Sequence, residues 1–173
     1  GTTNYVHQLP FFSVSIALWQ HGLPRLGLVL DPVRKELFCA LAGSGVTLNG
    51  DKISVSTTSE LSQALGAVSF PANIEDETDE VNRFTKALQH CRSLRRIGSA
   101  ALNLSYLAAG RLDAYWASSV KPWDVAAGIL LVQEAGGQVT AIDGGDFQID
   151  APVIMATATA PLHASLLELF RAS

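Results

Sequence analysis

The sequence contains few charged residues. Only 16% of its 173 residues are Asp, Glu, Lys or Arg, whereas about 25% is usual for globular domains. Acidic residues outnumber basic ones, and the formal net charge at pH 7 is −4. Proteins that bind nucleic acid or an anionic membrane surface electrostatically need a basic patch. We therefore expect no nucleic acid and no membrane among the main partners.

Cysteines and long apolar runs are also scarce. The two cysteines, Cys39 and Cys91, lie far apart, so the sequence has neither a disulfide framework nor the close spacing of a zinc site. We expect both to be reduced, buried thiols, which is usual in the cytoplasm. No apolar run reaches the roughly 18 residues that suggest a membrane-spanning helix, and no secretory signal is expected. These absences favour a cytoplasmic protein.

Common catalytic motifs are missing as well. The four histidines (His7, His21, His90 and His163) are scattered and form no HExxH pair, so we expect structural or surface roles for them. The sequence has no GxSxG nucleophile motif, no P-loop and no GxGxxG fingerprint. The GSG at residues 43–45 is expected to form a tight turn. A function has to be sought in other segments.

Hydrophobic residues are abundant, at 48% of the chain, which suits one core-rich domain over residues 1–173. Strand-like segments joined by short turns come first, and Asn49-Gly50 is the clearest hairpin turn. Helices and strands then alternate, which predicts an α/β fold of layered sheets and helices. The expected strands cover 11–19, 26–32, 35–42, 45–56, 66–70, 112–118, 138–143 and 152–158, and the main expected helices cover 81–90, 99–109, 122–135 and 160–170.

Two charged stretches interrupt this pattern. The run IEDETDE at residues 74–80 is expected to be a solvated loop that leads into a helix, where acidic residues suit the positive end of the helix dipole. Val81, Phe84 and Leu88 then recur at helical spacing. The run RSLRRIG at 92–98 carries three arginines without interleaved aromatic residues. It favours a salt-bridging or subunit-contact surface over nucleic-acid binding.

One acidic residue opens the apolar segment PWDVAAGILLVQEAGG, residues 122–137. Burying a carboxylate among Ala, Gly, Ile, Leu and Val is unfavourable unless something compensates it. Two interpretations of Asp124 remain open. It can be the N-cap of a helix that starts beside Pro122, or it can be a carboxylate held at a helix N-terminus to ligate a hard cation such as Mg²⁺.

Two further segments could bind an anion. GTTN, residues 1–4, offers hydroxyl and backbone N–H groups ahead of a helix-like stretch, which suits phosphate. An ordinary Thr or Asn cap is the alternative. Gly98, Ser99 and Ala100 open another helix, with Ser99 as its N-cap and Gly110 as its C-terminal stop. Their small side chains would let a ligand approach the backbone.

Three segments occur in the order GTTNYVHQLPFFSVSIAL, RRIGSAALNLSYLAAGRLDAYW and PWDVAAGILLVQEAGG. Together they resemble the inositol monophosphatase family of magnesium-dependent, lithium-sensitive phosphatases, and the resemblance extends over residues 1–173. It implies a layered αβαβα sandwich, usually a homodimer. The implied activity is hydrolysis of a phosphate monoester, with Mg²⁺ as cofactor and a small phosphorylated molecule as substrate.

The same resemblance implies roles for individual residues. Asp124 corresponds to a metal-ligand aspartate of the family. Thr2 corresponds to the catalytic threonine that hydrogen-bonds the nucleophilic water, and Gly1 and Thr2 correspond to the backbone that meets the phosphate. Residues 98–100 correspond to the lining of the substrate pocket.

The chain departs from the family pattern at its start. The other family signature reads DP-[ILV]-DGT, and this sequence begins at its GT. We therefore expect a partial domain that lacks the metal-binding aspartates of that signature. The chain alone is expected to be inactive and to expose apolar surface that favours dimerisation or aggregation. A non-catalytic role as a dimer scaffold or binding module is the alternative of a different class.

A second departure concerns specificity. Inositol phosphatases carry a glutamate after the YW or YY pair, where it contacts substrate hydroxyls, and this sequence has Ala117 there. A methyl group cannot accept a hydrogen bond from a hydroxyl. Besides inositol monophosphate and related sugar or alcohol phosphates, three other substrates therefore remain open. They are histidinol phosphate, fructose 1,6-bisphosphate and adenosine 3′,5′-bisphosphate.

Overall fold

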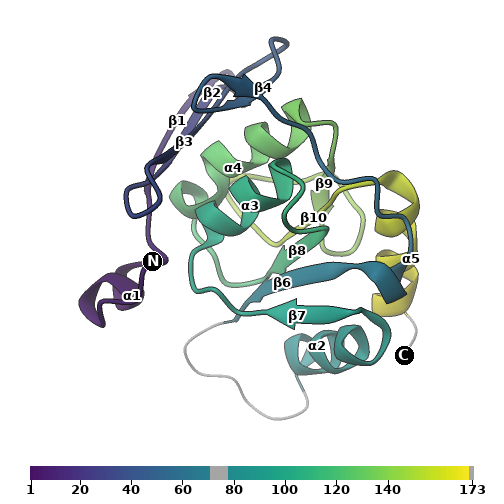
Figure 1. Ribbon diagram of the computed structural model, residues 1–173. Helices are drawn as coiled ribbons and strands as arrows, with labels where there is room; N and C mark the ends of the chain where they lie inside the picture. Colours follow the sequence, from purple (N-terminus) through teal and green to yellow (C-terminus); the bar gives the residue numbers. More distant parts are fainter. Residues whose placement is uncertain (71–77, 172–173) are drawn as a thin grey trace.

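Two five-stranded sheets organise the residues that the computed structural model describes, 1–70 and 78–171 (Figure 1). The first sheet runs β1-β2-β3-β4-β5, and the second has the order β7-β6-β8-β10-β9. The strands of the first sheet are β1 (Val14–Gln20), β2 (Leu23–Asp31), β3 (Glu36–Leu41), β4 (Val46–Leu48) and β5 (Asp51–Lys52). The strands of the second sheet are β6 (Leu65–Ser69), β7 (Ser93–Arg95), β8 (Ala114–Ala117), β9 (Gln138–Ala141) and β10 (Ile154–Thr157). The helices are α1 (Thr2–Val6), the short 3-10 turn η1 (Leu61–Gln63), α2 (Asp79–His90), α3 (Ala100–Ala108), α4 (Pro122–Glu134) and α5 (Ala160–Arg171). Hairpins come first and helices and strands then alternate, so the predicted order is confirmed.

The first sheet is an antiparallel meander, because each strand pairs with the strand before it in the chain. The predicted turn at Asn49-Gly50 joins β4 to β5, and both residues have positive φ, 51° and 94°. Such φ values characterise the tight hairpin turns that favour Asn-Gly. Side chains alternate across the sheet, and Val29 and Phe38 lie on its buried face.

The second sheet separates two hydrophobic cores. Strand β6 pairs in parallel with β7 and β8, whereas β10 pairs antiparallel with β8 and β9. Successive side chains point to opposite faces of a strand, so the neighbours Tyr115 and Trp116 on β8 belong to different cores. One core faces α3, α4 and the first sheet. The other faces α2 and α5 on the outer side.

Helices α3 and α4 form the layer between the sheets (Figure 1). Residues 125–132 of α4 are all buried, which explains why this helix is apolar around its whole circumference. Its small residues permit close packing. A Cβ atom added at Gly128 would lie 2.5 Å from Cβ of Leu104 on α3. The stretch AAG therefore lets the two helices approach each other.

The other face of the first sheet is apolar and exposed. Val14, Ile16 and Leu18 of β1 are 53%, 55% and 56% exposed, and Leu41 of β3 is 53% exposed. The described residues thus stack as sheet, helix pair, sheet and helix pair, which confirms the predicted α/β layers. The predicted exposure of apolar surface is confirmed.

The outer helix pair covers the second sheet. Helix α2 begins after Thr78, whose Oγ1 accepts a hydrogen bond from the N–H of Val81 at 3.5 Å, and two acidic residues occupy its first turn as predicted. The predicted apolar stripe on α2 is partly wrong, since Leu88 is 56% exposed and Ala87 is buried instead. Residues 74–77 of the predicted acidic loop lie outside the described residues. Within the described ranges, no helix is both long and apolar enough to cross a bilayer.

The structure agrees with the expectations for the cysteines and histidines except at Cys39, which was expected to be buried. Both thiols are free, but only Cys91 is buried; burial raises its pKa to about 11. Cys39 is half-buried because it alternates with the inward Phe38 and Ala40 on β3. Three histidines are exposed, whereas His163 is buried, with hydrogen bonds of 2.9 Å to the hydroxyls of both Thr140 and Thr157.

Candidate active site

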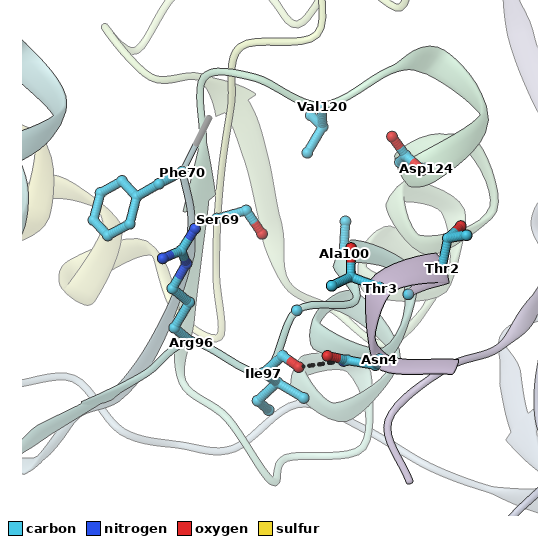
Figure 2. Close-up of a pocket in the computed structure, with 12 residues that line it drawn as sticks. Thr2, Thr3, Asn4, Ser69, Phe70, Arg96, Ile97, Ala100, Val120 and Asp124 are labelled. Atoms are coloured by element: carbon cyan, nitrogen blue, oxygen red, sulfur yellow. Dashed lines mark hydrogen bonds between the residues drawn. The ribbon is translucent and has the colours of Figure 1, made fainter. Parts of the chain in front are cut away.

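A pocket of about 530 Å³ lies where α1, the end of β6 and the starts of α3 and α4 meet (Figure 2). Its volume falls within the range of roughly 300–1,000 Å³ that is typical of small-molecule sites. Five of the predicted site residues share it: Gly1, Thr2, Gly98, Ala100 and Asp124. The other lining residues are Thr3, Asn4, Ser69, Phe70, Arg96, Ile97 and Val120. Segments far apart in the sequence are therefore assembled into one cavity.

Asp124 lies in the first turn of α4. The helix starts at Pro122 with Lys121 as its N-cap residue, so the interpretation of Asp124 as the N-cap is wrong by three positions. Proline at the first helical position fixes this start, because its missing N–H has no intrahelical partner there. Oδ2 of Asp124 accepts a hydrogen bond of 2.9 Å from the N–H of Lys121. No described residue donates a hydrogen bond to Oδ1 of Asp124 in the structure.

Helix α1 is attached to the pocket through Asn4. The Nδ2 of Asn4 donates hydrogen bonds of 2.8 Å to the carbonyls of both Phe11 and Ile97. Gly98 follows with φ of +84°, and a Cβ atom there would lie 2.9 Å from Nδ2 of Asn4. Glycine is required at position 98 because that φ is unfavourable for other residues. Gly1 precedes α1 without a side-chain cap, so the alternative of a Thr or Asn cap is wrong.

Two predicted site residues do not line the pocket. Ser99 is the N-cap of α3, as predicted, and its Oγ accepts from the N–H of Leu102 at 3.4 Å while remaining 2% exposed. Ala117 is 1% exposed on β8, where it pairs with Ser69. The next residue, Ser118, donates a 2.7 Å hydrogen bond to Glu80 that lowers the pKa of this carboxyl.

Residues missed by the sequence interpretation complete the pocket wall. Ser69 ends β6, and its Oγ accepts a hydrogen bond of 3.0 Å from the hydroxyl of buried Tyr115. Burial raises the pKa of Tyr115 well above its usual value, so this hydroxyl remains a donor. Ligands often bind at the carboxyl ends of parallel strands; that rule could have pointed to Ser69. Phe70, Arg96, Ile97 and Val120 also line the pocket and were not predicted as site residues.

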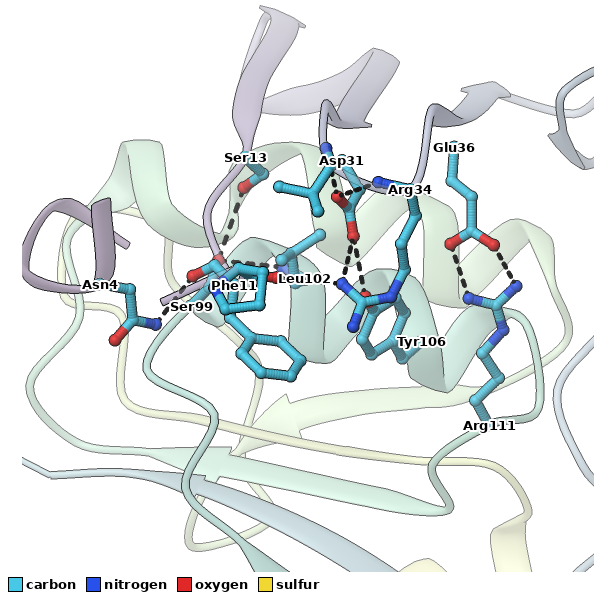
Figure 3. Close-up of polar contacts among 12 residues, drawn as sticks. Asn4, Phe11, Ser13, Asp31, Arg34, Glu36, Ser99, Leu102, Tyr106 and Arg111 are labelled. Carbon is cyan, nitrogen blue, oxygen red and sulfur yellow. Dashed lines mark hydrogen bonds and ion pairs between the residues drawn. The ribbon is translucent and has the colours of Figure 1, made fainter. Parts of the chain in front are cut away.

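A buried carboxylate on β2 is hydrogen-bonded to α3 (Figure 3). Asp31, which is 0% exposed at the end of β2, accepts a 2.9 Å hydrogen bond from the hydroxyl of Tyr106 on α3. It also accepts from the backbone N–H groups of Val33 and Arg34 and from the Arg34 guanidinium, at 3.0, 3.0 and 3.1 Å. These bonds connect the β2–β3 turn to the helix whose N-terminus borders the pocket.

The described residues fit one side of a Mg²⁺ site. A carboxylate oxygen such as Oδ1 of Asp124 is the hard ligand that Mg²⁺ prefers. Figure 2 shows Thr2 and Asp124 on the same side of the pocket, opposite Arg96 and Phe70. Within residues 1–70 and 78–171, no group of three or more His, Cys, Asp or Glu side chains could hold a metal ion. Asp124 is the one carboxylate among the described residues that line the pocket.

Known proteins share this sequence and architecture. The sequence model described as the inositol monophosphatase family matches residues 1–173. Nus factor SuhB of Escherichia coli K12 is 44% identical over 146 residues, which are 84% of this chain and 55% of the relative. Inositol-1-monophosphatase of Synechocystis is 40% identical over 158 residues, which are 91% of this chain and 55% of the relative.

The solved structure of inositol monophosphatase from Anabaena has the same fold. It matches with a TM-score of 0.92 at 43% identity, covering 98% of this chain and 67% of the solved one. The chain spans about half the length of the curated relatives it matches. Because both the sequence match and the structural match extend over essentially all of its residues, the chain belongs to the inositol monophosphatase family.

Proposed function

We propose that the whole protein is a Mg²⁺-dependent phosphatase that hydrolyses a small phosphate monoester, such as inositol monophosphate or a related sugar or alcohol phosphate. The observation that carries this proposal is the meeting of Asp124, Thr2 and Gly98 in one pocket. The pocket has the volume of a small-molecule site. The name of the Synechocystis relative, inositol-1-monophosphatase, supports the same class of reaction.

The proposed chemistry is transfer of the phosphoryl group to water. The oxygen of water attacks phosphorus, the ester P–O bond breaks, and the alcohol leaves after gaining a proton. Mg²⁺, when bound beside Asp124, supplies positive charge that stabilises the charge developing on the phosphoryl group. Positioning accounts for much of the rest of phosphoryl-transfer catalysis. The hydroxyl of Thr2 would orient the water, and the backbone of Gly1 and Thr2 would bind the phosphate.

Small residues on the α3 side would let the substrate approach the backbone. Gly98 and Ala100 present no bulk to the pocket, and Ser99 between them directs its hydroxyl into the helix cap. We propose that the backbone at 98–100 contacts the substrate. Ala117, at the position of the family's glutamate, is buried and has no polar side-chain atom. Histidinol phosphate, fructose 1,6-bisphosphate and adenosine 3′,5′-bisphosphate therefore remain alternative substrates.

Replacing Asp124 tests the proposal. In the full-length protein, Asp124→Asn keeps an oxygen that can accept from the N–H of Lys121 but removes the charge that Mg²⁺ needs. Release of inorganic phosphate should fall by about 100-fold or more while the melting temperature stays nearly constant. Asp143→Asn is the matched control, because Asp143 accepts a similar local bond from Gly145 outside the pocket.

A panel of phosphate monoesters decides the reaction class. Release should require Mg²⁺ and should be measured on inositol, sugar, histidinol and nucleotide monophosphates. Absence of metal-dependent release from every member would refute the proposal. The 173-residue chain alone should show no turnover, because its described residues offer the pocket one carboxylate.

Several expectations about partners stay predictions. We propose a homodimer in the cytoplasm, and the two free thiols agree with a reducing compartment. The name Nus factor belongs to the E. coli relative. For this chain, the net charge of −4 supports the prediction that nucleic acid is not a partner. A filter-binding assay with RNA would check it, and retention of RNA at physiological salt would contradict it.

A further inference from the structure

The pocket carries two charged side chains of opposite sign among its described lining residues, Asp124 and Arg96. Figure 2 shows them on opposite sides of the cavity. The sequence favoured a salt-bridging or subunit-contact surface for the arginine run; Arg96 forms no ion pair with any described residue, and the subunit contact stays a prediction. It is exposed to the pocket instead. Arg96 is therefore an exposed cation on the pocket wall opposite Asp124 and Thr2, and its charge requires an explanation.

Contacts with neighbouring residues hold Arg96 in place. It follows β7 and precedes Ile97, whose carbonyl accepts the 2.8 Å hydrogen bond from Asn4. Its guanidinium lies over the ring of Phe70, with 5.5 Å between the guanidinium carbon and the ring centroid. Phe70 in turn packs edge-on against Phe84 of α2, at 5.3 Å between ring centroids. Stacking on an aromatic ring orients a guanidinium and leaves its N–H groups available.

We propose that Arg96 binds a second anionic group of the substrate, so that the protein prefers phosphate monoesters that carry another phosphate or carboxylate. This inference rests on the proposed phosphatase function. The reacting phosphate belongs on the side of Asp124 and Thr2, and Arg96 is on the opposite side. A guanidinium has five N–H donors and no acceptor. Its planar fork matches the paired oxygens of a phosphate or carboxylate.

The identity of the residue at position 117 supports the same inference. Ala117 offers no acceptor to the hydroxyls of a neutral polyol and is buried in β8. Arg96 offers donors only, which bind an anion more strongly than a hydroxyl. Inositol phosphatases use a glutamate to accept hydrogen bonds from substrate hydroxyls. In this protein, Arg96 would instead neutralise a negative charge on the part of the substrate that lies away from the reacting phosphate. The specificity-determining residue is Arg96.

Matched substrates separate the second anion from the first. Full-length protein with Mg²⁺ would be assayed on fructose 1-phosphate against fructose 1,6-bisphosphate, and on adenosine 3′-phosphate against adenosine 3′,5′-bisphosphate. In Arg96→Ala, kcat/KM for each bisphosphate should fall by about tenfold or more, the effect of losing a hydrogen bond to a charged group. The value for each monophosphate should stay within about twofold. Arg96→Lys should keep part of the preference, because the charge stays and the fork is lost.

The neighbouring arginine is the control. Arg95 is also exposed but does not line the pocket, and its Nη1 donates to Ser93 and to the carbonyl of Leu94. Successive residues at a strand end point in opposite directions, so Arg95→Ala should alter neither substrate class. It also controls for the general loss of one positive charge.

Two kinetic results would overturn the inference. An equal loss on mono- and bisphosphates would mean that Arg96 contacts the reacting phosphate, and no loss on either would mean that it contacts no substrate anion. A wild-type protein without turnover would refute the proposed function only. Calorimetric titration of the same substrate pairs would then decide the role of Arg96, since its loss should weaken binding of the bisphosphates alone.

Discussion

Replacing Asp31 should strongly destabilise the domain. This carboxylate is 0% exposed and accepts four hydrogen bonds from Val33, Arg34 and Tyr106. Arg34 can turn to water after the change, because its side chain is 36% exposed. The hydroxyl of Tyr106 cannot, because that residue is only 7% exposed. The penalty therefore comes mainly from the buried donors that are left behind.

Three variants give graded magnitudes. Asp31→Ala removes every acceptor and should cost about 3–5 kcal/mol, because the hydroxyl of Tyr106 and the backbone N–H groups of Val33 and Arg34 each lose a partner at about 1–3 kcal/mol. Asp31→Asn keeps one oxygen for the backbone N–H groups but presents an amide donor to Tyr106 or Arg34, which should cost about 2–3 kcal/mol. Tyr106→Phe removes a single donor and should cost about 1–1.5 kcal/mol.

Low pH should weaken the same network. Burial opposes ionisation of Asp31, but hydrogen bonds from Arg34 and Tyr106 outweigh it and lower the pKa of this carboxyl below 3.8. Ionised Asp31 therefore stabilises the folded state above the ordinary pKa of 3.8, and this stabilisation is lost as the pH falls through the lower folded value. Burial and the bond to Asp31 raise the pKa of Tyr106 to about 12, so its hydroxyl stays a donor throughout.

Urea unfolding followed by circular dichroism would measure the three free energies near neutral pH. The difference between wild type and Asp31→Asn should then shrink when the pH is lowered below 3.8. The reasoning is refuted if Tyr106→Phe is as damaging as Asp31→Ala, or if Asp31→Ala costs less than about 1 kcal/mol.

Three further changes probe packing, a loop contact and a buried base. Gly128→Ala should cost about 1–3 kcal/mol in thermal unfolding, and Leu104→Ala should not rescue it, since the new methyl would lie 2.5 Å from the Cβ that remains. Glu134→Gln should cost about 1–2 kcal/mol in urea unfolding and speed hydrogen exchange at residues 43–45, because the carboxylate accepts two backbone N–H bonds of 2.7 Å there. Burial lowers the pKa of His163 below 6.5, so the unfolded chain binds a proton first and the free energy of unfolding decreases as the pH drops below 6.5. His163→Gln should make this decrease with pH smaller, which melting curves at successive pH values would measure.

Much of the fold could be predicted because its signals are local. The alternation of polar and apolar residues at 11–19 and the Asn49-Gly50 turn each depend on a few adjacent residues. The exact stripe on α2 could not be predicted in this way. Ala87 and Leu88 are adjacent and both apolar, so only the packing of α2 against the sheet decides which of them is buried.

The candidate site was predictable only where a motif was present. Asp124 and residues 98–100 stand in recognisable segments, and the pocket includes most of them. Asp31 and Tyr106 meet across 75 positions and Asn4 and Ile97 across 93, which no local pattern encodes. The place of Arg96 on the pocket wall could not be predicted for the same reason. Its sequence neighbours are Arg95 and Ile97, whereas its guanidinium lies over the ring of Phe70.

Asp124 shows how a structural role and a chemical role can coexist in one side chain. The first turn of α4 needs one acceptor for the N–H of Lys121, and Oδ2 provides it. Asparagine could also accept that bond, and the negative charge of Asp124 suits the positive end of the helix dipole, but neither role accounts for the position of Asp124 on the pocket wall. Residues 125–132 that follow are buried, and Glu134 at the other end of α4 accepts bonds from Gly43 and Gly45, so Asp124 is the acidic residue that α4 places at the pocket. The helix dipole and a bound cation predict different results for Asp124→Asn: the first predicts a lower melting temperature, and the second predicts loss of Mg²⁺-dependent phosphate release at an unchanged melting temperature.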